Sequence, residues 1–105
     1  MLFRSVKIQV KATQNAKARW ILTKKAEKYF STDFFYVFVR LGKTGQRPDF
    51  HIVPSQIVAE QIGKSHQEWL RGAKKNGERR KDSDIRNYWD EAGTFYEKWE
   101  LLDTD

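Results

Sequence analysis

The stretch FFYVFVRL, residues 34–41, is an almost continuous run of aromatic and β-branched side chains. Such a run predicts a β-strand covered on both faces, because a strand with one wet face alternates apolar and polar residues. Residues 42–48 are rich in turn-forming residues, and residues 49–53 resume a strand pattern. We therefore expect a hairpin in which the second strand returns antiparallel to the first.

The clearest helix of the sequence begins at Pro54-Ser55, directly after this hairpin. Its apolar residues fall close to one stripe at helical spacing, with His66 beside them: Ile57, Val58, Ile62, Trp69 and Leu70. This spacing predicts one long helix that packs its stripe on the sheet.

Upstream of the hairpin, residues 4–13 contain VKIQVKAT (residues 6–13), which alternates apolar and polar residues. The alternation predicts a strand whose apolar face is core, formed by Val6, Ile8, Val10 and Ala12. We expect this strand to keep one open side. Thr23 is a candidate N-cap for a short helix over residues 24–29. The aromatic tail from Ile85 onward is expected to pack on the sheet as a short helix or an irregular arm.

Together these elements predict one α/β domain over residues 1–105, with a small mixed sheet of three to four strands, one long helix and one short helix. The chain has no cysteine, which excludes disulfides, thiolate zinc sites and cysteine nucleophiles. It has no apolar run of bilayer length and no secretion signal. We therefore expect a cytoplasmic protein without a membrane partner.

The net charge of +6 is unevenly distributed. Residues 1–30 hold eight basic residues and one acid, residues 64–86 hold eight basic residues and four acids, and the last nineteen residues are acidic. Two basic blocks can fold into one positive surface that attracts phosphate backbones. The alternative is a set of ordinary solvated cations balanced by the acidic tail.

The polar segment of residues 72–82 is the leading candidate for contacts with nucleic-acid phosphates. The candidate residues for binding nucleic acid are Lys7, Lys24, Lys25, Lys74, Lys75, Arg79, Arg80 and Lys81. A flexible, solvated loop is the competing interpretation of residues 72–82. His51 is expected at the surface, because it faces away from Phe50 and Ile52, and His66 is expected to form a local hydrogen bond.

Gln9 and Lys11 are the candidate catalytic pair. Residues i and i+2 of a strand lie on the same face, roughly 6–7 Å apart, so the amide of Gln9 and the ammonium of Lys11 can point at one phosphate. Gln9 can offer an oxygen to a metal ion, and Lys11 can orient the attacking water. By spacing alone, the alternative of an ordinary solvated strand face remains open.

Several ordered blocks nevertheless resemble one known family. They are QVKAT (residues 9–13), Trp20, LTKKAE, FYVFV, FHIVPS, VAEQI, SHQEWL and YEKWELL. In this order they resemble small prokaryotic proteins with the restriction-endonuclease-like fold, the PD-(D/E)XK nuclease superfamily. The resemblance covers nearly the whole chain. It implies metal-dependent hydrolysis of DNA, with Mg²⁺ held in part by Gln9 and the water assisted by Lys11.

The family's pattern also needs an Asp on the preceding strand, and this sequence begins only eight residues before Gln9. Of the other carboxylates, Asp33, Asp49, Asp82 and Asp84 do not sit where the family pattern requires one. The resemblance therefore predicts a domain that is truncated at its N-terminus relative to the family, with an incomplete Mg²⁺ ligand set. Such a chain is expected to be inactive on its own, unless an acidic ligand is supplied from elsewhere. The alternatives are a non-catalytic nucleic-acid-binding module and a homo-oligomer that pairs through the open strand.

Overall fold

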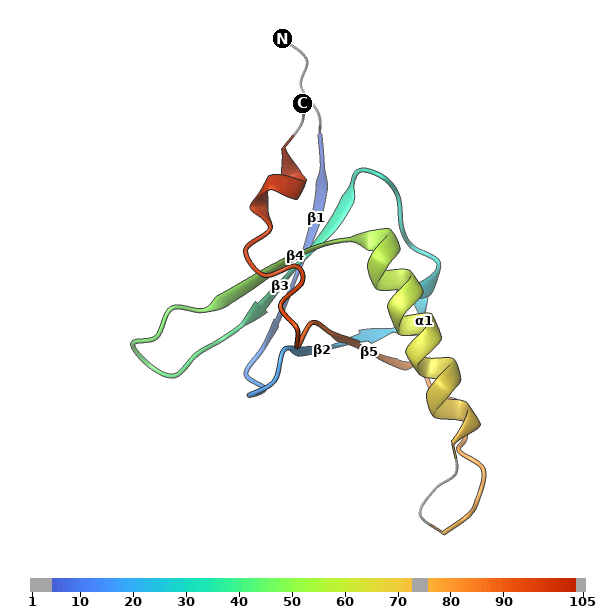
Figure 1. Cartoon of the computed structure of the whole chain (residues 1–105). Coiled ribbons are helices and arrows are strands. Elements are labelled where there is room, and N and C mark those ends of the chain that lie inside the picture. Colours follow the sequence, from blue (N-terminus) through green and yellow to red (C-terminus); the bar gives the residue numbers. More distant parts are fainter. Residues whose placement is uncertain (1–4, 73–75, 104–105) are drawn as a thin grey trace.

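The computed structural model describes residues 5–72 and 76–103, and it confirms the α/β class (Figure 1). In chain order the elements are β1 (Lys7–Thr13), β2 (Arg19–Thr23), the 3-10 helix η1 (Lys24–Glu27), β3 (Phe34–Arg40), β4 (Asp49–Pro54), α1 (Ser55–Arg71), β5 (Ile85–Trp89) and the 3-10 helix η2 (Trp99–Leu102). The strands form one sheet in the order β1-β3-β4 and a separate two-stranded ribbon of β2 and β5.

Strand β3 is the centre of the three-stranded sheet. It pairs antiparallel with β4, as the hairpin pattern predicts, and parallel with β1. All of its residues up to Val39 are buried, so the expectation of a strand covered on both faces is confirmed. Within the described part of the chain, β1 is an edge strand with an open side, which was also expected.

Because β1 and β3 are parallel, the chain between them must cross from one end of the sheet to the other. Residues 14–33 make this crossover and contain β2 and η1. In place of the short helix expected over residues 24–29, the crossover contains only the four-residue 3-10 turn η1. Thr23, the expected N-cap, makes no side-chain cap hydrogen bond. Strand β2 pairs antiparallel with β5, so the expectation of a helix or irregular arm is wrong for residues 85–89.

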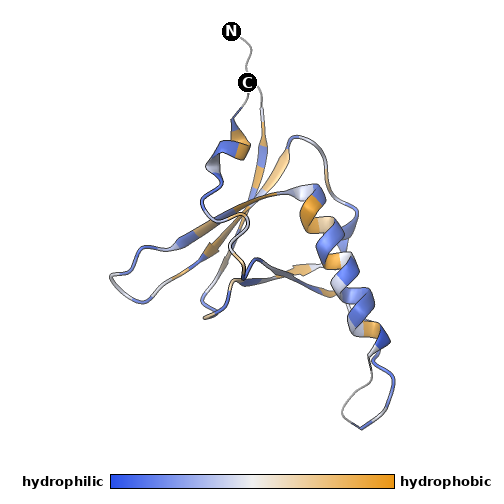
Figure 2. Ribbon diagram, in the orientation of Figure 1, coloured by the Kyte–Doolittle hydropathy of each residue, from blue (hydrophilic) through white to orange (hydrophobic). Residues whose placement is uncertain are grey.

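The main core lies between one face of the sheet, helix α1 and the β2–β5 ribbon. Its buried residues are Trp20, Leu22, Ala26, Phe34, Tyr36, Phe38, Val53, Val58, Ile62 and Tyr88. Phe38 stacks between Tyr36 and Tyr88, with ring centroids 5.2 and 4.7 Å away. The Trp20 indole N–H donates to the Val39 carbonyl at 2.9 Å, so β2 is attached to β3 by a buried hydrogen bond. Figure 2 shows the apolar stretches of β3 and β4 beside the hydrophilic loop that joins them.

The opposite face of the sheet carries a second cluster, formed by Phe35, Val37, Val39 and Ile52. Leu101 and Leu102 of η2 pack against it, so residues 90–103 form the arm that the aromatic tail predicted. This cover does not extend over β1. Val6, just before β1, is partly buried against this cluster. Ile8 is 46% exposed, Val10 is 62% exposed and Ala12 is also exposed, so the prediction that this face is core is wrong for these three residues.

Helix α1 starts at Ser55, as predicted, and buries part of the expected stripe, namely Val58 and Ile62 with His66 beside them. Its buried residues are Ser55, Val58, Ala59, Ile62 and His66, whereas Ile57 and Trp69 are exposed. The Ser55 hydroxyl donates to the Ser31 carbonyl and accepts from the Ser31 N–H, both at 3.0 Å. These bonds join the end of the crossover to the start of the helix. Among the described residues, no helix is both long and apolar enough to cross a membrane.

Candidate functional site

Gln9 and Lys11 lie on the face of β1 that is turned toward the crossover, and both line a pocket of about 510 Å³. We call this hollow the lysine pocket. Its walls are Gln9, Lys11, Leu22, Thr23, Lys25, Ala26, Lys28, Tyr29 and Tyr36. The structure therefore brings together the two predicted residues of β1 and one predicted cation of the crossover, Lys25.

The parallel pairing of β1 and β3 determines where this pocket lies. Gln9 is the β1 partner of Tyr36 and Lys11 is the partner of Phe38, so these side chains share one face of the sheet. Tyr36 is 2% exposed and stacks on Phe38, which gives the pocket a rigid base. The crossover then passes over the same face and supplies the remaining walls from β2 and η1.

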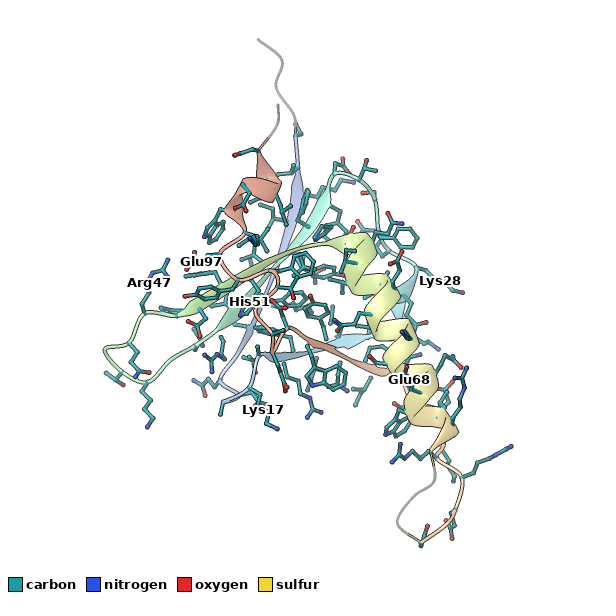
Figure 3. All side chains as sticks on the ribbon, in the orientation of Figure 1. Lys17, Lys28, Arg47, His51, Glu68 and Glu97 are labelled. Atoms are coloured by element: carbon teal, nitrogen blue, oxygen red, sulfur yellow. The ribbon has the colours of Figure 1, made fainter. Side chains whose placement is uncertain are left out.

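Lys28 and Tyr29 belong to the site but were not among the predicted residues. Lys25 and Lys28 are three residues apart, and Lys28 donates its backbone N–H to the Lys25 carbonyl at 3.2 Å. In a 3-10 turn, residues i and i+3 lie on the same side, so this spacing was a usable signal. Nothing in the sequence indicates that Tyr29 and Tyr36 lie at one pocket, because the crossover brings them there. Lys28 projects at the outer side of the molecule, away from His51 (Figure 3).

The electrostatic character of the lysine pocket is positive. Lys11, Lys25 and Lys28 line it, and no carboxylate is among its wall residues. In the described part of the chain, no ion pair neutralises these three ammonium groups. Several like charges around one hollow repel each other, and an anion bound between them relieves that repulsion.

Two acids that lie in or against the crossover are paired elsewhere. Glu27 of η1 accepts a hydrogen bond from the buried guanidinium of Arg86 on β5. Asp84 pairs with Lys24, with 3.3 Å between the ammonium nitrogen and the carboxylate oxygen. Lys24, a predicted phosphate contact, is therefore not a wall of the pocket and has a carboxylate partner, whereas its neighbour Lys25 faces the pocket.

Uncharged polar groups complete the lining. Burial raises the pKa of Tyr36, and the neighbouring Tyr29 raises it further, so the Tyr36 phenol stays protonated at neutral pH. A neutral phenol donates a hydrogen bond to an anion, as does the hydroxyl of Thr23. The Gln9 amide offers both a donor and an acceptor. The pocket thus offers hydrogen-bond donors as well as charge to an oxyanion.

The lining does not fit the Mg²⁺ ion that the resemblance implies. Mg²⁺ prefers carboxylate and phosphate oxygens in octahedral geometry. The pocket offers one amide oxygen from Gln9 and the neutral hydroxyls of Thr23, Tyr29 and Tyr36, beside three lysines. Among the residues that the structure describes, no group of three or more His, Cys, Asp or Glu side chains is arranged to hold a metal. The four carboxylates considered above, Asp33, Asp49, Asp82 and Asp84, are not walls of the pocket.

The other predicted phosphate contacts do not join the pocket. Lys7 is exposed on the same face of β1 but is not one of the wall residues. Arg79 and Arg80 line a separate hollow of about 780 Å³ at the far end of α1. Arg80 is held there, because it donates to the Trp69 carbonyl at 2.8 Å and lies over the Trp69 ring. Lys81 is exposed, and Lys74 and Lys75 lie outside the described residues.

His66 makes its hydrogen bond with a residue distant in sequence, not with its own helix. Its Nε2 lies 2.7 Å from a carboxylate oxygen of Asp82, and its ring stacks on Trp69. This hydrogen bond lowers the pKa of the exposed Asp82 carboxyl. The contact fixes the segment after α1 against the helix, so His66 has a clear structural role.

His51 is buried, and the prediction of a surface histidine is wrong. The register does turn it away from Phe50 and Ile52, but that second face of β4 is covered too. Trp20 packs on its ring at a centroid distance of 5.1 Å, and Tyr96 packs at 5.6 Å. Its Nδ1 lies 2.6 Å from a carboxylate oxygen of Asp90, and both side chains are at most 5% exposed. We call this pair the clasp; Figure 3 labels His51 at the middle of the molecule.

The clasp fastens the C-terminal arm to β4. The Asp90 carboxylate also accepts the backbone N–H groups of Thr94 at 2.9 Å and Phe95 at 3.0 Å. The arm then hydrogen-bonds along β4, from Ile52 N–H to the Phe95 carbonyl and from Glu97 N–H to the Phe50 carbonyl. These contacts account for both clasp residues as parts of the scaffold.

The outer end of the arm is held by a second pair. Arg47, in the loop between β3 and β4, donates to the Glu97 carboxylate, and the two side chains lie side by side in Figure 3. This hydrogen bond, with a second one from the Trp99 indole N–H, lowers the pKa of Glu97. The arm is thereby attached to the hairpin at both ends of residues 90–97.

These features define a small α/β protein with a cationic pocket built on the inner face of an edge strand. Comparisons with protein-family models, with curated proteins and with solved structures found no match.

The clasp can be tested with Asp90→Asn, which keeps the shape of the side chain but removes its charge and one acceptor. Since a buried polar group then loses its partner, we expect the free energy of unfolding to fall by about 1–3 kcal/mol. Urea denaturation measures this loss. Glu91→Gln is the matched control at the exposed neighbour, with an expected change within about 0.5 kcal/mol. Equal stability of the two variants would contradict a stabilising role of the clasp.

Proposed function

We propose that this protein binds DNA through its phosphate backbone, as a non-catalytic module on a scaffold related to the PD-(D/E)XK nucleases. The observation that carries this proposal is the lysine pocket, in which three lysines and no carboxylate meet around one hollow. The net charge of +6 adds long-range attraction for a polyanion.

The phosphodiester group matches the pocket chemically. It carries one negative charge and only oxygen acceptors toward the protein, and the pocket offers ammonium groups, the neutral phenol of Tyr36 and the hydroxyl of Thr23. Contacts of this kind position the backbone without reading the bases, so binding is expected to be independent of sequence and sensitive to salt.

Metal-dependent hydrolysis of DNA is the second candidate. Its support is that Gln9 and Lys11 extend from the same face of β1 into the pocket, as the resemblance implies for catalytic residues. The described residues supply no carboxylate to the pocket, so cleavage needs acidic ligands from elsewhere. For this reason we favour non-catalytic DNA binding over hydrolysis.

Lysine substitutions test the binding proposal. In fluorescence anisotropy with labelled DNA, Lys11→Ala, Lys25→Ala and Lys28→Ala should each weaken binding for every sequence. Each change should also reduce the slope of log K against log salt by about 1, because one counterion fewer is released. Lys43→Ala, an exposed lysine of the β3–β4 loop, is the control and should leave both quantities unchanged.

The same proteins, incubated with plasmid DNA and Mg²⁺ or Mn²⁺, separate the two candidates. Binding without nicking supports the module. Nicking that Lys11→Ala abolishes supports the enzyme and contradicts our first choice. If the unsubstituted protein fails to bind DNA at low salt, this result contradicts both candidate functions.

We also propose that the protein associates with a second copy through β1. The open edge of β1 and its exposed Ile8 and Val10 support this. An antiparallel pairing of two β1 strands centred on Val10 sets Ile8 opposite Ala12 and Lys11 opposite Gln9. Apolar side chains then meet on one face, and no like charges lie directly opposite on the other.

Sedimentation of two matched variants tests this interface. Val10→Lys should shift the protein from dimer to monomer, because it places two ammonium groups at the centre of the pairing. Ile21→Lys is the control, since Ile21 is 64% exposed, close to the 62% of Val10, but lies on the outer face of the β2–β5 ribbon. An unsubstituted protein that sediments as a monomer at high concentration would contradict the proposal.

A further inference from the structure

We infer that the lysine pocket receives one unpaired nucleotide of a DNA strand, with its phosphate on the lysines and its base against Tyr29. This inference rests on the proposed function and narrows it from DNA in general to single-stranded DNA or a single-stranded end.

The first observation is the shape of the pocket. It is a hollow of about 510 Å³ with walls from β1, β2, η1 with the residues after it, and β3. Pockets for small ligands measure roughly 300–1,000 Å³, so this volume suits one nucleotide. A base enters such a hollow only after it leaves its stack, and the cost of unstacking is smallest for a nucleotide that is already unpaired.

The second observation is the position of Tyr29. Tyr29 is 59% exposed at the pocket wall, yet its ring is supported by an edge contact with Phe34, with 5.1 Å between centroids and 67° between planes. A supported and exposed aromatic ring is a stacking platform for a base. Lysines around such a ring hold the backbone, which is the arrangement that proteins use to bind single strands.

The third observation is the distribution of polar and charged groups within the walls. The ammonium groups of Lys11, Lys25 and Lys28 provide the charge for a phosphate. Gln9 and Thr23 provide neutral donors and acceptors for the sugar or the base edge. Both parts of a nucleotide thus find a matching group in one hollow, whereas a duplex lying across the pocket would use only the lysines.

The test compares three labelled or competing ligands by anisotropy at one salt concentration. These are a mixed-sequence single-stranded oligonucleotide, a blunt-ended duplex of two fully paired strands with the same number of phosphates, and a free nucleoside 5′-monophosphate as a competitor. We expect the single strand to bind at least tenfold more tightly than the blunt duplex. The monophosphate should compete only weakly, because it lacks the neighbouring phosphates.

Substitutions at Tyr29 separate stacking from charge. Tyr29→Ala should weaken single-strand binding roughly 5- to 100-fold and leave duplex binding unchanged, because only an unpaired base stacks there. Tyr29→Phe keeps the ring and should retain the binding. Phe30→Ala is the control, since Phe30 is 47% exposed in the same segment but is not a wall of the pocket.

The outcomes distinguish this inference from the proposed function. If single strand and duplex bind equally and Tyr29→Ala changes neither, while Lys11→Ala weakens both, the inference is overturned and the DNA-binding proposal stands. If a monophosphate binds as tightly as the oligonucleotide, the assignment to a DNA strand is overturned. If no DNA binds, the proposed function fails and the inference with it.

Discussion

The parallel pairing of β1 with β3 is the constraint on which the rest of the structure depends. A parallel pair cannot be joined by a tight turn, so residues 14–33 must travel back along the sheet. The face they cover is the one that holds Gln9 and Lys11 on β1 and Tyr36 on β3. The crossover thus helps to close the main core and, at the edge of the sheet, leaves the lysine pocket.

The charge of this pocket follows from how the surrounding acids are paired. Glu27 lies in the crossover between Lys25 and Lys28, and it is directed to the buried Arg86 on β5. Asp84 is likewise held by Lys24. The three pocket lysines are therefore left without an anionic partner among the described residues. This is why an oxyanion from outside is the ligand class that we propose, and why a divalent cation fits the same walls poorly.

The sequence predicted the elements that have strong local patterns, namely β1, β3, β4 and the start of α1. It missed β2 and β5, because each is only five residues long and is stabilised by its distant partner rather than by its own pattern. It predicted Gln9, Lys11 and Lys25 at the site from alternation and charge. Tyr29 and Tyr36 could not be predicted together, since only the crossover brings them to one hollow.

Two errors about burial have a common physical cause. Alternation tells which residues share a face of a strand, but it does not tell what covers that face. His51 was placed correctly opposite Ile52, yet Trp20 and the C-terminal arm cover it. Ile8 and Val10 share a face with the buried Phe35 and Val37, yet η2 stops short of the edge strand. Which elements pack on a strand face is decided by the tertiary structure, so the local sequence pattern could not reveal it.

The register of β1 against β3 decides whether the lysine pocket forms, because a slip of one residue would turn Gln9 and Lys11 to the opposite face. Nuclear Overhauser contacts between the two strands in solution measure it most directly. We expect cross-strand backbone contacts that pair Val10 with Val37 and Lys11 with Phe38 in parallel orientation. Contacts that pair Lys11 with Val37, or an antiparallel pattern, would contradict this register and the lysine pocket built on it.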